Sequence, residues 1–168
     1  MVPVTIAKLG LDSVSNAYVV LLQERNGERV LPIWIGRPEA ESIAVQISGV
    51  KHERPMTHDL CQLIIAGLGA TLRRVQVTRL QNGTFFAELH LERGGGAPVI
   101  VDARPSDSIA IALRLDAPIY VSEALLGGDQ EDGLPEQPAG RDDDTLSAEK
   151  LQRHLEQLRP EDFGKFTP

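Results

Sequence analysis

The chain has 168 residues, a single cysteine and a formal net charge of −7. This length suits one domain of ordinary size with a real core, and a lone cysteine excludes an internal disulfide. The N-terminus lacks the basic start and unbroken apolar stretch of a signal peptide, and no segment approaches the ~18 apolar residues of a membrane span. We therefore expect a cytoplasmic protein with no membrane partner.

The negative charge is concentrated towards the C-terminal end. Residues 1–127 contain 12 Lys+Arg and 13 Asp+Glu, whereas residues 128–168 contain 5 and 11. The body of the protein is thus nearly neutral, without the broad basic surface typical of nucleic-acid-binding domains. A local cluster of arginines would still serve a small nucleic-acid footprint.

The first part of the chain predicts strands, because β-branched and aliphatic residues dominate it. Asn26-Gly27 between the second and third strands is a strong hairpin signal. Pro32 in the third strand favours the edge of a sheet or a bulge, since proline has no N–H to donate. The three strands are expected at residues 2–10, 17–24 and 29–36.

Two helices are expected next, at about 38–49 and within 54–69. Pro38 suits the first turn of a helix, and Glu39 favours its positive end. Thr57 is the predicted N-cap of the second helix. The apolar face of this second helix consists of Leu60, Leu63 and Ile64.

The second half of the domain repeats the pattern of strands followed by a helix. A hairpin is predicted around Asn82-Gly83, and a helix that is apolar on nearly all sides should be deeply buried. The strands are expected at 70–80, 84–92, 98–103 and 118–121, and the helix at about 105–115. Together these elements predict an α+β fold for residues 1–127, with a mixed or antiparallel sheet of hairpins and three main helices packed on it.

The composition changes after this domain. Residues 128–146 are rich in Gly, Pro, Asp and Glu, which is typical of an acidic flexible linker. Residues 147–168 begin with an amphipathic segment that predicts a short helix followed by a tail. Such a short helix is marginal alone and is expected to dock on the body or on a neighbour.

Two segments, 33-IWIGRPEAESIAV-45 and 99-VIVDARPSDSIAI-111, resemble each other with one residue of offset. Both run from an apolar strand through Arg-Pro and an acid to Ser-Ile-Ala. Either strand-to-helix junctions favour these residues generally, or the segments are two related units. Each junction places an arginine, Arg37 or Arg104, beside a helix N-terminus, where an anion or the chain's own carboxylates would be held.

Several segments together resemble the bifunctional nuclease domain family over roughly residues 3–127. They are 31-LPIWIG-36, 55-PMTHDL-60, 82-NGTFFAEL-89, 102-DARPSDSIAIAL-113 and 117-APIYV-121. The resemblance implies an enzyme that cleaves DNA and RNA, with a compact α+β domain that tends to form homo-oligomers. It does not assign catalytic residues, so these must be inferred from chemistry.

Two kinds of chemistry are consistent with the residues. A metal-dependent site holding Mg²⁺ or Mn²⁺ would use carboxylates, for which Asp102, Asp107 and Glu39 are the candidates. A metal-free site would use His58 as the general base beside Asp59. In either case the candidate phosphate-binding residues are Arg104, Arg37 and Ser106.

Two functions therefore compete. The first is a nuclease that hydrolyses phosphodiester bonds in DNA and RNA. The second is a non-catalytic oligomeric module that binds an anionic ligand or a protein partner, which the near-neutral body and the sparse carboxylates favour.

Overall fold

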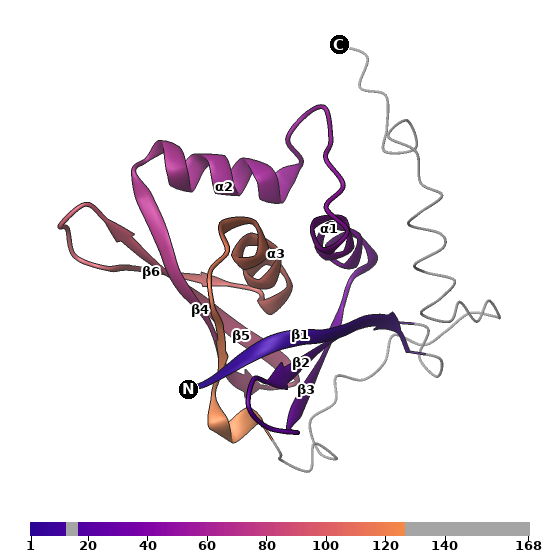
Figure 1. Ribbon diagram of the computed structural model, residues 1–168. Helices are drawn as coiled ribbons and strands as arrows, with labels where there is room; N and C mark the ends of the chain where they lie inside the picture. Colours follow the sequence, from indigo (N-terminus) through magenta and orange to yellow (C-terminus); the bar gives the residue numbers. More distant parts are fainter. Residues whose placement is uncertain (13–16, 127–168) are drawn as a thin grey trace.

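The computed structural model describes residues 1–12 and 17–126, so the linker expected at 128–146 and the helix and tail expected at 147–168 lie outside the described residues. The domain has the predicted α+β fold, with a seven-stranded mixed sheet and three α-helices (Figure 1). The strands are β1 (Val2–Leu11), β2 (Tyr18–Glu24), β3 (Val30–Ile35), β4 (Ala70–Gln81), β5 (Thr84–Arg93), β6 (Val99–Ala103) and β7 (Ile119–Val121). The helices are α1 (Arg37–Ile47), α2 (Thr57–Gly67), α3 (Pro105–Leu115) and the short 3-10 helix η1 (Glu123–Leu125).

The sheet consists of two similar halves joined by its last strand. The strand order is β3-β2-β1-β7-β4-β5-β6, and every pair is antiparallel except β4 with β7. Each half is an antiparallel meander of three consecutive strands that ends at an edge of the sheet and continues into a helix, α1 or α3. The repeated sequence segments thus form the two equivalent edge-strand-to-helix junctions, which favours the interpretation that they are related units.

The hairpin signals in the sequence correspond to real turns of different width. Asn82 and Gly83 both have positive φ, at 51° and 71°, as the tight turn between β4 and β5 requires. The turn between β2 and β3 is wider and is closed by a hydrogen bond from Glu24 N to Arg29 O. Pro32 lies in β3 at the edge of the sheet, as predicted.

The helices cover one face of the curved sheet, and α3 lies closest to its centre (Figure 1). Helix α3 contacts α1, α2, β4 and β5. Its side chain Ile109 is fully buried, as are Val75 and Val77 on β4. This apolar contact fixes α3 against the strands and holds its N-terminal end beside the other two helices.

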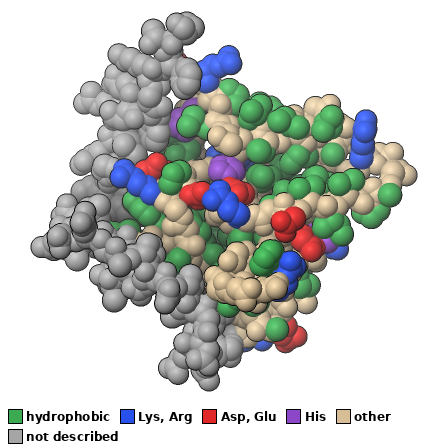
Figure 2. Space-filling view, turned by 180° about the vertical axis from the view of Figure 1, so that it is seen from behind, with side chains coloured by type: hydrophobic (Ala, Val, Ile, Leu, Met, Phe, Trp, Pro, Cys, Tyr) green, Lys and Arg blue, Asp and Glu red, His purple; other side chains and the backbone are tan. Residues whose placement is uncertain are grey.

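Helix α2 differs from the sequence prediction in two respects. Its N-cap is Met56 rather than Thr57, because the Asp59 carboxylate accepts the Met56 backbone N–H at 2.8 Å and so determines where the helix begins. The predicted apolar face is also not turned towards the core. Leu60, Leu63 and Ile64 are about half exposed, and hydrophobic side chains are spread over that side of the molecule (Figure 2).

No helix in the described ranges is both long enough and apolar enough to span a membrane.

Candidate active site

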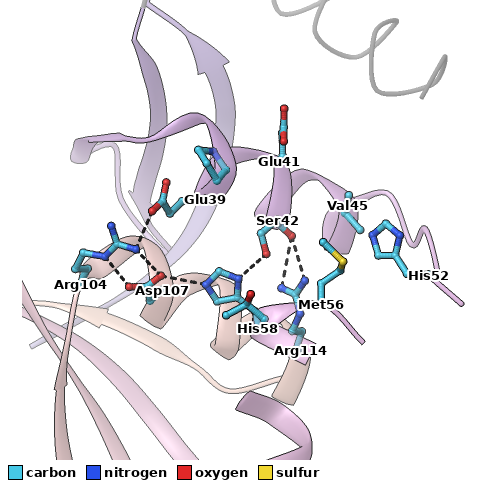
Figure 3. A pocket seen from close by; sticks show the side chains of 12 residues that line it. Glu39, Glu41, Ser42, Val45, His52, Met56, His58, Arg104, Asp107 and Arg114 are labelled. Carbon is cyan, nitrogen blue, oxygen red and sulfur yellow. Dashed lines mark hydrogen bonds and ion pairs between the residues drawn. The ribbon is translucent and has the colours of Figure 1, made fainter. Parts of the chain in front are cut away.

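A pocket of ≈ 320 Å³ opens where the three helices meet (Figure 3). On the same side of the domain as α2, a small group of charged and histidine side chains lies among hydrophobic ones (Figure 2). The pocket combines three carboxylates, two guanidiniums and two imidazoles. Its lining residues are Pro38, Glu39, Glu41, Ser42, Val45, His52, Met56, Thr57, His58, Arg104, Asp107 and Arg114.

His58 lies at the centre of a hydrogen-bonded line that crosses all three helices (Figure 3). Its Nδ1 is 2.8 Å from Ser42 Oγ on α1, and its Nε2 is 3.1 Å from Asp107 Oδ1 on α3. The His58 side chain is only 13% exposed. The imidazole is therefore held on both sides in a site that is largely shielded from water.

Arg104 and Glu39 extend this line beyond Asp107. Arg104 donates to both carboxylate oxygens of Asp107, from Nε at 2.7 Å and from Nη2 at 3.0 Å. Its Nη2 also lies 2.7 Å from Glu39 Oε1 on α1. The Arg104 side chain is nevertheless 66% exposed, so it remains accessible to an anion from solvent.

These contacts determine the protonation of Asp107. Partial burial pushes the pKa of Asp107 upward, but the hydrogen bonds from Arg104 and His58 and the charge of Arg104 outweigh burial and hold the pKa below the ordinary 3.8. At neutral pH Asp107 is therefore ionised and can only accept hydrogen bonds. His58 must donate from Nε2, and in the neutral imidazole Nδ1 is left as the acceptor.

A second ion pair supports the floor of the pocket. Arg114 is 3% exposed, and its Nε donates to Asp59 Oδ1 at 2.5 Å. Its Nη1 donates to Ala110 O at 2.9 Å, and both terminal nitrogens lie within 3.5 Å of Ser42 O. Burial raises the pKa of Asp59, but the bonds from Arg114 and the Met56 N–H lower it more, so the net shift is downward. This pair ties α2 to α3 beneath Ser42.

The structure brings four of the predicted site residues together in the pocket: His58, Asp107, Arg104 and Glu39. The others lie elsewhere. Arg37 pairs with Glu41 at 2.7 Å, and Asp59 holds Arg114 rather than lining the pocket. Asp102 lies on β6 opposite Glu88, and Ser106 is buried in α3.

The carboxylates of the pocket are not arranged as a metal site. Within residues 1–12 and 17–126, no group of three or more His, Cys, Asp or Glu side chains is placed to hold a metal ion. Both carboxylate oxygens of Asp107 and Oε1 of Glu39 are instead paired with the Arg104 guanidinium. This donor set therefore does not fit Mg²⁺ or Mn²⁺.

Comparison with known proteins decides the family. A family model described as the bifunctional nuclease domain matches residues 20–132, which is more than half of the chain. The chain belongs to the bifunctional nuclease domain family. The resemblance seen in the sequence is thereby confirmed.

Relatives of this bifunctional nuclease domain occur in bacteria and plants. An uncharacterized protein of Mycobacterium tuberculosis (strain CDC 1551) is 42% identical over 165 residues, which cover 95% of this chain and 96% of that protein. Bifunctional nuclease 1 of Arabidopsis thaliana is 30% identical over 145 residues, covering 83% of this chain and 45% of that protein. Bifunctional nuclease 2 of the same plant is 31% identical over 113 residues, 66% of this chain and 34% of that protein. The chain therefore spans less than half the length of these plant relatives.

Sequence reasoning missed three residues of the site in this bifunctional nuclease domain. Ser42 and Arg114 carried no signal, since a single serine or arginine within a helix is ordinary. His52 also lines the pocket, although no pattern around it in the sequence marked it as a site residue. The similarity between the two strand-to-helix segments matched Ser42 with Ser108, but nothing in it indicated which serine would meet a histidine.

Proposed function

We propose that this chain is a nuclease that hydrolyses phosphodiester bonds in DNA and RNA. The observation that carries the proposal is the hydrogen-bonded line through His58, with an ionised carboxylate on Nε2 and the Ser42 hydroxyl on Nδ1, the nitrogen that accepts hydrogen bonds. Phosphodiester hydrolysis is accelerated by a group that takes the proton of the nucleophile, and a positioned histidine can act as that general base. Membership of the bifunctional nuclease domain family and the names of the plant relatives support the same function.

The remaining residues have roles that follow from their contacts. Asp107 holds the imidazole in the tautomer with Nε2 protonated and stabilises the imidazolium that forms when Nδ1 takes a proton. Arg104 presents an exposed guanidinium beside it, which suits a phosphate oxygen. Glu39 holds the same guanidinium through Nη2. The nucleic acid would thus be bound by a few directed contacts rather than by a broad basic surface.

The balanced charge of the pocket leads to a binding test. Three carboxylates and two guanidiniums leave no net positive charge, so we expect weak binding that involves few phosphates. Fluorescence anisotropy with labelled single-stranded DNA should show an affinity that falls as salt is raised, with a shallow slope. Absence of binding even at low salt would remove the support for a nucleic-acid substrate.

The decisive test is cleavage of labelled single-stranded DNA and RNA by highly purified full-length protein. His58→Gln should reduce cleavage by about 10²–10⁴-fold, since it removes the acid–base group. His90→Gln is a matched control, because His90 is also 13% exposed and also faces a carboxylate, Glu88, at 3.0 Å, but lies outside the pocket. Parallel reactions with Mg²⁺, Mn²⁺ and EDTA test metal dependence separately.

Each outcome of the cleavage test is informative. Loss in His58→Gln with full activity in His90→Gln supports the proposal. Equal activity in wild type and His58→Gln indicates a contaminating nuclease or another site, and absence of cleavage in wild type removes the enzymatic function.

The second candidate function is a non-catalytic oligomeric module for an anionic ligand or a protein partner. Its specific support is the exposed apolar face of α2, formed by Leu60, Leu63, Ile64 and Leu68. We propose that copies of the chain associate through this face whether or not the pocket is catalytic, and that the protein acts in the cytoplasm. Sedimentation of the variant Leu63→Lys beside wild type tests the association.

A further inference from the structure

Ser42 lies within α1, and its hydroxyl is hydrogen-bonded to Nδ1 of His58, the nitrogen that would act as the base. We propose that Ser42 is a nucleophile activated by His58 and oriented by Asp107, and that it attacks the phosphorus of a phosphodiester bound in the pocket. The choice of a phosphodiester as substrate rests on the proposed function, whereas the test of the serine does not. It identifies a seryl hydroxyl, rather than water, as the group from which His58 first takes a proton.

The geometry has the three parts that nucleophilic catalysis by serine requires. The hydroxyl lies within hydrogen-bonding distance of a histidine, and a carboxylate orients that histidine from its other nitrogen. Because Nε2–H is committed to Asp107, the Ser42 hydroxyl donates to the lone pair of Nδ1. In serine proteases Nε2 meets the serine and Nδ1–H meets the aspartate, whereas here the two ring nitrogens exchange these roles.

The contacts of Ser42 differ from those usual for a serine inside a helix. Such hydroxyls commonly bond back to a carbonyl of the preceding turn. Ser42 Oγ instead points towards His58 on another helix, 2.8 Å away, and lines the pocket (Figure 3). The hydroxyl is thus placed where a substrate in the pocket can reach it.

Ser108 has the same sequence context as Ser42, but no histidine of the described residues is bonded to its hydroxyl. It occupies the position that corresponds to Ser42 in the repeated segment, before Ile109-Ala110 as Ser42 is before Ile43-Ala44. Ser108 is fully buried, and its Oγ has no hydrogen-bond partner among the residues that the structure describes. The sequence pattern is therefore shared, whereas the pairing with a histidine belongs to Ser42 alone of the two.

Two guanidiniums flank the line and are suited to the charge that develops on the phosphoryl oxygens. Arg114 lies next to the Ser42 backbone, with its terminal nitrogens 3.4 and 3.5 Å from Ser42 O. Arg104 lies at the opposite end of the line, bonded to Asp107 and exposed. Arg114 is shielded from water, where a fixed positive group stabilises such charge more strongly than it would in water, whereas Arg104 can meet the phosphate at the solvent-exposed end of the pocket.

The proposed reaction has two balanced steps. Ser42 Oγ forms a bond to phosphorus while its proton passes to His58 Nδ1, and the bond from phosphorus to the leaving oxygen, which lies in line on the far side, breaks as that oxygen takes a proton from water. The hydroxide so formed attacks the phosphoseryl ester from that far side, and the seryl–phosphorus bond breaks as Ser42 Oγ takes back the proton held on Nδ1. No oxidant, reductant or further reactant is needed, and the serine is regenerated.

A fluorophosphonate probe tests nucleophilicity independently of nuclease activity. In this probe the seryl oxygen displaces fluoride from phosphorus and leaves a stable covalent adduct, which mass spectrometry of the digested full-length protein locates. We expect the adduct on Ser42 in wild type and its absence in Ser42→Ala. His58→Gln should slow labelling by about 100-fold or more, because the proton acceptor is lost.

Ser108→Ala is the matched control for these variants and should be labelled at the wild-type rate. Circular dichroism and thermal melting of each variant separate loss of reactivity from loss of folding. Absence of any Ser42 adduct in folded wild-type protein would overturn the proposal. So would labelling at an undiminished rate in folded His58→Gln, since the serine would then not be activated by that histidine.

The two proposals fail separately. If nuclease activity depends on His58 but survives fully in Ser42→Ala, and no adduct forms, His58 activates water and the serine inference is wrong. If Ser42 is labelled in a His58-dependent manner but no nucleic acid is cleaved, the serine is an activated nucleophile and the assignment of the substrate is wrong.

Discussion

Helices α2 and α3 are both 11 residues long, but their environments differ greatly. Eight residues of α3 are buried, whereas none of α2 is, although α2 is the more apolar of the two on average. The reason is their place on the sheet. Helix α3 contacts strands and both other helices, while α2 packs mainly on α3 and β4.

This difference shows that apolar composition does not by itself indicate which face of a helix meets the core. Cys61 and Ile65 lie on the side of α2 that packs against the core. Leu60, Leu63 and Ile64 are about half exposed. An exposed apolar helix face of this kind is typical of an interaction surface. The polar line through His58 then forms where the buried helix and the exposed one meet.

The largest expected effect on stability comes from truncating a buried side chain of α3. Ile109→Ala removes a fully buried side chain and should lower the free energy of unfolding by about 4 kcal/mol, through lost burial and the cavity left behind. Ile64→Ala in α2, which is 51% exposed, should cost less than about 1 kcal/mol. Urea denaturation of both variants measures the difference, and similar losses would show that α2 is as firmly packed as α3.

The ion pair between Asp59 on α2 and Arg114 on α3 should have the next largest effect on stability. Asp59→Ala leaves the guanidinium of Arg114 buried without its partner and should lower the free energy of unfolding by about 3 kcal/mol. Glu92→Ala breaks an ion pair with the exposed Arg73 and should cost less than about 1 kcal/mol. The double variant Asp59→Ala/Arg114→Met should recover part of the stability, and no recovery would argue against the unpaired charge as the cause.

Low pH should weaken the contacts that Asp59 and Asp107 make between α2 and α3. Both Asp59 and Asp107 have folded-state pKa values below the ordinary 3.8, so their contribution to stability is complete above that value and is lost as the pH falls through the lower, folded-state values. Asp107→Asn should therefore be less stable than wild type at neutral pH by on the order of 1–2 kcal/mol. The gap should narrow as the pH falls below about 4 towards about 2. Urea unfolding across this range tests it, and a constant gap would contradict the assigned interactions.

The exposed face of α2 should have the smallest effect on the fold and its main effect on association. Leu63→Lys should change the free energy of unfolding of the isolated chain by less than about 0.5 kcal/mol, because Leu63 is already about half exposed. Sedimentation analysis should show self-association of wild type that this variant reduces. Val30→Lys, an exposed position on the edge strand β3, is the matched control and should sediment as wild type does. Unchanged sedimentation of Leu63→Lys would place any interface elsewhere.

Much of the secondary structure could be predicted because it depends on short stretches of the chain. The Asn-Gly turns, the alternation in the strands and the apolar run of α3 all act over a few residues, and every strand and helix predicted within the described residues is present. The order of the strands could not be predicted. The insertion of β7 between β1 and β4 is a long-range pairing that no local pattern encodes.

The candidate site divides in the same way. The sequence by itself marked His58, Asp107 and Arg104, because a histidine and an acid at helix starts, and an arginine before a helix-starting proline, are local signals. Only the tertiary structure decided that His58 bonds to a serine 16 residues before it and to an aspartate 49 residues after it. The physical reason is that α1, α2 and α3 are brought together by burying α3 against the sheet, and that packing, not any local pattern, determines which polar side chains meet above it.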